Sequence, residues 1–119
     1  MAEKVDRLTR VNELIKRELA NYLQKFPPET PGVLVSVTEV VTSVDLRNAT
    51  VSISIFGGTD AVRGEVFRFL NSRRSDMQRV LARTLAFEHT PVLAFKPDHR
   101  IELGDRVLAM LNGDDPEKR

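Results

Sequence analysis

Apolar residues recur at three- and four-residue spacing through the first part of the chain, from about residue 5 to residue 26. Val11, Ile15 and Leu19 share one side of a helix at this spacing, and charged residues fall largely between them. The pattern predicts an amphipathic helix with one buried stripe. The "PPETPG" that follows should end this helix, because proline removes a backbone donor and favours extended conformations in the residue before it.

Two segments rich in β-branched residues come next, "VLVSVTEVVTSV" and "ATVSISIF". The second alternates between valine or isoleucine and serine or threonine, which predicts a half-buried strand. The first loses its alternation at Glu39 and Val40, which indicates a β-bulge nearby. The "DLRN" connection predicts a short turn in which Asp45 bonds the backbone two residues on. Together they predict an antiparallel hairpin whose apolar face needs a helical layer to cover it.

A second helical pattern starts at Thr59 or Asp60, either of which can cap it, and it is interrupted by "NSRRS" at residues 71–75. Asparagine and serine are poor interior helix residues because their side chains bond nearby backbone groups. Ser75 followed by Gln78 has the form of a capping box, which predicts a fresh helix beginning there.

Two further elements complete the prediction, a short strand at "PVLAFKP" and a helix over roughly residues 99–112. The expected order is α-β-β-α-α-β-α. This order indicates a small α+β domain in which helices cover one face of a three-stranded sheet.

Composition limits the function classes. The chain has 119 residues, 41% of them hydrophobic, so it can bury one core and is expected to form one monomeric domain. It has no cysteine, which suits a reducing compartment. No segment has the length and hydropathy of a signal peptide or membrane span, so we expect a soluble cytoplasmic protein.

The sequence gives little support for catalysis or for a bound cofactor. His89 and His99 lie ten positions apart with no metal-ligand spacing, and no phosphate-binding glycine loop or serine-elbow motif is present. Asp98 beside His99 is a candidate acid/base pair, but adjacent residues usually point apart. We therefore predict a protein that is not an enzyme and needs no metal or cofactor.

The charge distribution is more informative than the net charge of +1. Between residues 63 and 83, six arginines against Glu65 and Asp76 give a local charge of +4. Arginine suits phosphate because its planar guanidinium donates paired hydrogen bonds, and a helix N-terminus adds free N–H groups. Two interpretations stay open, a polyanion-binding surface such as one for RNA, and a solvated helix face.

The aromatic residues fall mostly on the apolar stripes. Core packing is therefore predicted for Tyr22, Phe26, Phe69 and Phe87, and base stacking is not predicted.

Four segments, "RVNELIKRELANYLQ", "VTEVVTSVDLRNATVSISIFG", "FLNSRRSDMQRVLARTL" and "TPVLAFKPD", occur in this order. They resemble the bacterial ribosome-binding factor A family over about residues 7–110. The hairpin segment is the most specific part, through Thr38, Val40, Ser43, Asp45, Leu46, Ala49 and Val51.

The resemblance implies a KH-like fold of the second topological type, here a single domain over residues 4–112 with a flexible tail at 113–119. It also implies non-catalytic binding of 16S ribosomal RNA on the small (30S) subunit during late assembly. The implied location is near the RNA's 5′ region, with roles in 5′-end processing and in cold stress.

The chain has no G-x-x-G, the loop with which KH domains approach nucleic acid, and the family's Ala-x-Gly kink reads Arg73-Arg74-Ser75 here. We therefore expect side chains and a helix terminus to make the RNA contact. The predicted contact residues are Arg68, Arg73, Arg74, Ser75, Gln78, Arg79 and Arg83, with Arg7 and Arg10 as a second patch. The alternative is a protein-interaction module that docks through its sheet edge and makes no RNA contact.

Overall fold

A computed structural model describes residues 2–85 and 90–98. Its elements run α1 (Ala2–Lys25), β1 (Leu34–Thr42), β2 (Asn48–Phe56), α2 (Asp60–Ser72), α3 (Arg74–Thr84) and β3 (Val92–Pro97). The order α-β-β-α-α-β and a three-stranded sheet confirm the predicted KH-like α+β fold. The predicted helix at 99–112, the tail, Phe87, His89 and His99 lie outside the described residues.

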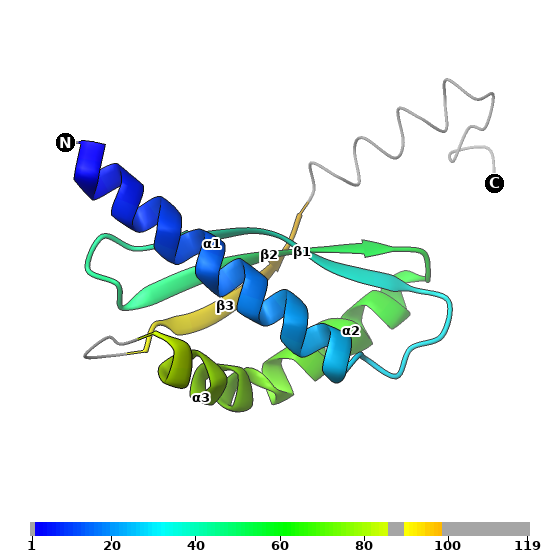
Figure 1. The fold of residues 1–119 in the computed structure, drawn as a ribbon. Helices are drawn as coiled ribbons and strands as arrows, with labels where there is room; N and C mark the ends of the chain where they lie inside the picture. Colours follow the sequence, from blue (N-terminus) through cyan, green and yellow to red (C-terminus); the bar gives the residue numbers. More distant parts are fainter. Residues whose placement is uncertain (1, 86–89, 99–119) are drawn as a thin grey trace, which may run out of the picture.

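The sheet has the strand order β1-β2-β3, in which β1 and β2 pair antiparallel and β2 and β3 pair parallel. Figure 1 shows α1 crossing over the strands, while α2 and α3 follow one another at an angle beside it. The helix α1 and the α2–α3 pair pack on the same face of the sheet, and the core between the helices and the sheet is apolar. Its fully enclosed side chains come from every element except β1 and include Ile15, Leu19, Val51, Ile53, Val66, Leu70, Met77, Leu81 and Leu93, while β1 contributes the buried Val37 and Val40.

The predicted bulge is present, one residue earlier than the sequence indicated. Val37 pairs with Ile53 and Glu39 with Ser52, so Thr38 is the extra residue. The Thr38 hydroxyl donates a 2.6 Å hydrogen bond to the buried carboxylate of Asp98, which follows β3. The bulge thus ties β1 to the end of β3 across the central strand.

The central strand is more buried than its alternation predicted. The isoleucine and valine face points into the core as expected, but Ser52 and Ser54 on the other face are also buried. Both are small, and Ser52 has a paired strand on either side, whereas Ser54 pairs with Ser36 of β1 alone. Exposed apolar side chains on this outer face, Leu34 and Phe56 among them, lie at the ends of the strands.

The hairpin turn confirms the role predicted for Asp45. Its Oδ1 accepts from the Arg47 N–H at 3.1 Å and from the Ser43 hydroxyl at 2.7 Å. These bonds hold the pKa of the Asp45 carboxyl below its usual value, the Ser43 bond having the larger effect. They also fix Leu46 at a φ of 62°, a left-handed conformation that is uncommon for a side chain of this size.

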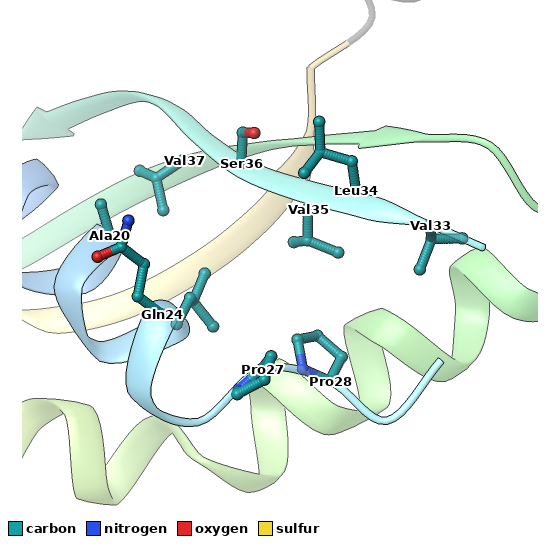
Figure 2. Close-up of a pocket in the computed structure, with 10 residues that line it drawn as sticks. Ala20, Gln24, Pro27, Pro28, Val33, Leu34, Val35, Ser36 and Val37 are labelled. Carbon is teal, nitrogen blue, oxygen red and sulfur yellow. The ribbon is translucent and has the colours of Figure 1, made fainter. Parts of the chain in front are cut away.

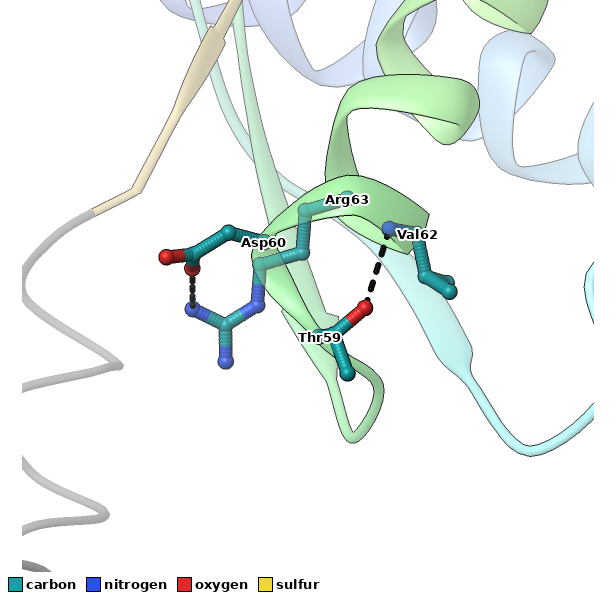
Figure 3. Close-up of polar contacts among 4 residues, drawn as sticks. All are labelled: Thr59, Asp60, Val62 and Arg63. Carbon is teal, nitrogen blue, oxygen red and sulfur yellow. Dashed lines mark hydrogen bonds and ion pairs between the residues drawn. The ribbon is translucent and has the colours of Figure 1, made fainter.

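The start of α2 follows the predicted cap. The Thr59 hydroxyl accepts from the Val62 N–H at 3.3 Å, and Asp60 in the first turn lies 3.9 Å from the Arg63 guanidinium (Figure 3). A carboxylate at this position also interacts favourably with the positive end of the helix dipole. Gly57, at a φ of 91°, makes the preceding turn, where a Cβ would lie 2.5 Å from the Gly32 carbonyl oxygen.

The interruption between α2 and α3 is a single residue, Arg73, with φ −96° and ψ 1°. Asn71 and Ser72 donate from their side chains to the carbonyls of Phe67 and Phe69, at 3.0 and 2.6 Å. These side chains compete with the helix ladder in the way the sequence suggested. The Arg73 N–H is shared between the Phe69 and Leu70 carbonyls, both at 3.1 Å, so the last turn of α2 closes at this residue.

The predicted capping box is wrong. The helix begins at Arg74, its N-cap is Arg73, and no side chain caps it. Gln78 is turned toward the sheet instead, where its Oε1 accepts from the Leu93 N–H at 3.3 Å. That acceptor is unavailable to Ser75, because it satisfies a backbone donor of β3.

Within the described residues, no helix combines the length and the apolar character needed to cross a membrane.

Candidate nucleic-acid interface

The predicted arginines lie on the exposed sides of α2, the break and α3. Arg68 on α2 and Arg74 at the first position of α3 are exposed. Ser75, Arg79 and Arg83 are exposed too, and their four-residue spacing places them along one stripe of α3. The structure therefore brings most of the predicted RNA-contacting residues onto one helix pair, with α3 presenting a continuous polar row.

Arg73 is oriented differently from the other arginines. Its guanidinium carbon lies 5.5 Å from the centre of the Phe69 ring and 6.0 Å from that of the Phe26 ring. Arg73 is exposed like the other predicted arginines, but cation–π contacts favour keeping its guanidinium against these two rings. Arg73 is thus positioned by the ends of α1 and α2.

The first turn of α3 carries both attractive and repulsive features for an anion. Its leading N–H groups have no acceptor within the helix, and no side chain caps them. Asp76, however, also lies in this first turn, where its charge occupies the favourable end of the dipole. A phosphate at this terminus would approach against Asp76, so the exposed arginines must supply most of the attraction.

Asp76 is held by a buried partner on α1. The Tyr22 hydroxyl donates to its Oδ2 at 2.6 Å. Burial and then this carboxylate raise the pKa of Tyr22 above 10.0, and nearby Arg73 partly opposes the rise. The Tyr22 contact therefore fixes the start of α3 relative to α1.

Three predicted contact residues are placed less favourably. The Gln78 side-chain carbonyl already accepts from β3, so Gln78 has a structural role whatever its amide group does. Arg7 and Arg10 are exposed on α1, but Arg10 precedes Tyr22 by twelve residues, about 18 Å along the helix. They form a separate patch, and Glu13 and Arg17 beside Arg10 give that surface mixed charge.

The exposure of Phe26 differs from the sequence prediction. Its place on the apolar stripe predicts core packing, but 46% of the residue is exposed, because α1 ends at Lys25 and the chain turns away toward Pro27. The ring packs against Tyr22, with centroids 5.0 Å apart and planes tilted by 46°. Tyr22 is buried as predicted, and Phe69 is partly buried. The available signal was the position of Phe26 directly before two prolines, beyond which the helical stripe cannot extend.

A second surface lies at the opposite edge of the sheet. An apolar cleft of about 410 Å³ separates the end of α1 from β1. Figure 2 shows Pro27 and Pro28 facing the side chains of Val33 and Val35 across it. In the part of the chain that the structure describes, β1 pairs only with β2, so its outer edge can accept another strand.

Among the described residues, no three His, Cys, Asp or Glu side chains gather closely enough to hold a metal ion.

Comparisons with known proteins agree with this fold. A family model described as "Ribosome-binding factor A" matches residues 7–111. A protein of that name from Rippkaea orientalis is 38% identical over 108 residues, covering 89% of this chain and 84% of its own length. A solution NMR structure of a putative ribosome binding factor A from Thermotoga maritima is 26% identical, with a TM-score of 0.65, and covers 76% of this chain and 85% of that one.

A third comparison concerns Thermus thermophilus ribosome binding factor A, in a homology model fitted into the cryo-EM map of a 30S complex. It is 27% identical with a TM-score of 0.58, and it covers 71% of this chain and 88% of its own. The family model matches residues 7–111, and a relative of that name is 38% identical. This chain therefore belongs to the ribosome-binding factor A family.

Proposed function

We propose that this protein binds the small ribosomal subunit as a non-catalytic assembly factor, and that α2 and α3 contact phosphates of 16S ribosomal RNA. The observation that carries the proposal is the set of exposed arginines along the broken helix pair of a ribosome-binding factor. Support for the partner comes from the Thermus relative, which has been fitted into the map of a 30S complex. The protein acts in the cytoplasm as a monomer, near the 5′ region of the RNA and during its 5′-end processing.

The residues have distinct roles in this proposal. Arg68, Arg74, Arg79 and Arg83 are exposed and pair with phosphates through charge-assisted hydrogen bonds. Ser75 adds its N–H group from the uncapped helix start. Arg73 contributes charge from its place against the two phenylalanine rings. The patch at Arg7 and Arg10 makes a second, weaker contact.

The salt dependence of binding to purified small subunits tests the proposal. Each phosphate contact that is lost should reduce the slope of log K against log salt by about 0.7 to 0.9. The variant Arg74→Gln/Arg79→Gln/Arg83→Gln is therefore expected to flatten the slope by about 2 to 3. A control variant, Arg47→Gln/Lys96→Gln, removes exposed cations that lie outside both proposed contacts and should change the slope much less for each charge removed. Equal changes of slope for each charge removed in the two variants would exclude the assignment of these arginines.

A second candidate is protein docking at the sheet edge, which the apolar cleft beside β1 favours. An extended segment of a ribosomal protein would pair with β1 and place apolar side chains between Pro28 and Val35. In that case Val35→Glu would abolish binding, and the triple arginine variant would leave both affinity and salt slope unchanged. The arginine-dependent slope therefore separates the two candidates.

A further inference from the structure

A hollow of about 480 Å³ opens where the end of α1 meets the end of α2, directly at the helix break. It lies within the usual size range of small-ligand sites. Its walls combine two aromatic rings, two cations, one carboxylate and a proline, supplied by Lys25, Phe26, Pro27, Glu29, Phe69 and Arg73.

The aromatic surface in this hollow is positioned before any ligand arrives. Phe26 is 46% exposed, yet its ring is held by Tyr22 on one side and lies near the Arg73 guanidinium. Tyr22 is fixed in turn by its bond to Asp76. A large apolar ring exposed next to a basic surface provides a flat contact for a planar ligand at little conformational cost.

Both positive and negative side chains line the hollow, and this limits how a nucleotide can be oriented in it. Lys25 and Arg73 suit a phosphate. Glu29 would repel a phosphate, but a carboxylate accepts hydrogen bonds from amino and imino N–H groups of a base edge. A nucleotide therefore fits with its base toward Phe26 and Glu29 and its phosphate toward Lys25 and Arg73.

We propose that this hollow binds one unpaired nucleobase of the ribosomal RNA, stacked on Phe26, with Arg73 beside it and Glu29 accepting from its N–H groups. The proposal rests on the proposed function, because it needs RNA at the helix break. It adds a contact that is apolar and base-directed to a surface otherwise suited to phosphates. Guanine, which presents two adjacent N–H donors, matches Glu29 better than uracil, whose single N3–H lies between two carbonyl acceptors.

Two substitutions at one position test the stacking. Removing a base stack should weaken binding about 5- to 150-fold. Phe26→Leu is therefore expected to lower the affinity for purified small subunits within that range while leaving the salt slope unchanged. Phe26→Trp keeps an aromatic face and should retain affinity. Because nearly half of Phe26 is exposed, neither substitution should unfold the protein, and Phe69→Leu provides a second loss-of-ring variant.

The chain has no tryptophan, so Phe26→Trp also introduces a single indole fluorophore. Titration with protein-free 16S ribosomal RNA should quench its emission, since a stacked base quenches indole, and Glu29→Gln should change the base preference of that quenching. Unchanged emission with RNA, combined with quenching by whole subunits, would overturn the base-binding proposal in favour of a peptide ligand.

The two proposals fail in different ways. If the triple arginine variant flattens the salt slope but Phe26→Leu binds as tightly as the natural protein, the base pocket is excluded and the phosphate contact stands. If Phe26→Leu weakens binding but the arginine variant leaves the slope unchanged, the RNA assignment itself is excluded, and the hollow receives an apolar group of a protein.

Discussion

The hydroxyl of Tyr22 donates a 2.6 Å hydrogen bond to Asp76, joining α1 to the first turn of α3 across 54 residues of sequence. Tyr22 is 4% exposed, so water has little access to its side of the bond. The contact orients the two elements that form the basic surface and the hollow beside it. Loss of this bond should therefore affect both the stability of the fold and the geometry of the surface that we propose binds RNA.

Tyr22→Phe is expected to destabilise the fold by about 1 to 2 kcal/mol. A hydrogen bond to a charged group typically contributes about 1.5 to 3 kcal/mol, and Asp76 recovers part of this because it is half-buried and can be rehydrated. Urea unfolding should show a lower midpoint with an unchanged m-value. Phe26→Leu, which alters an exposed neighbouring ring, should cost less, and a midpoint equal to that of the natural protein would show that water replaces the bond at no cost.

The same pair predicts a loss of stability at alkaline pH. Burial and the Asp76 carboxylate raise the pKa of Tyr22 above 10.0 in the folded state. The folded protein therefore keeps its phenolic proton at pH values where the unfolded chain loses it. The stabilisation is complete below pH 10 and decreases as the pH rises through the folded pKa. Between pH 9 and pH 12, the free energy of unfolding should fall less in Tyr22→Phe than in the natural protein. Lysines titrate in the same range in both proteins, so the difference between the two curves reports Tyr22 alone.

Tyr22 is the only tyrosine and the chain has no tryptophan, so ultraviolet absorbance reports its ionisation directly. The folded protein should show a single absorbance transition above pH 10. In urea, where the chain is unfolded, the transition should move down to the ordinary pKa of tyrosine. An unshifted transition in the folded state would contradict the buried hydrogen bond.

Local patterns predicted much of this fold because each depends on residues close in sequence. The alternation of apolar and polar residues around Val51 and Ile53 predicted which face of β2 is buried. Thr59 predicted the start of α2 because it caps the first turn of that helix. The side chains of Asn71 and Ser72 explain the helix break in the same way. Each of these features is decided within a few residues, where helix and strand periodicity apply.

Contacts between distant elements could not be read in this way. The acceptor of Gln78 binds β3, and nothing near Gln78 indicates that partner. The charge of Arg73 predicts a phosphate contact, whereas its position also depends on Phe26, which follows α1 and is distant in the sequence. Phe26 is exposed because α1 ends one residue before it. The last residue of a helix is harder to predict from sequence than the presence of the helix.

Gln78→Met separates a structural role from a role in RNA binding. Methionine fills similar space but leaves the Leu93 N–H without its acceptor, which should cost about 1 kcal/mol or more. The affinity for small subunits should keep its salt slope. Arg79→Gln, one residue along the chain, should show the opposite pattern, with unchanged urea stability and a reduced slope. A Gln78→Met protein of normal stability with impaired binding would restore Gln78 to the RNA contact.

Gly64→Ala is expected to stabilise the protein by about 0.5 to 1 kcal/mol. Gly64 lies inside α2 and is exposed, and a Cβ built there meets no atom within 4 Å. Alanine lowers the entropy of the unfolded chain and favours helix without creating a clash. Thermal unfolding should show a rise of several degrees in the midpoint. Gly57→Ala is the contrasting variant, because its φ of 91° and the 2.5 Å approach to the Gly32 carbonyl make a Cβ there destabilising. A loss of stability in Gly64→Ala would mean that α2 needs glycine for a contact at its exposed face.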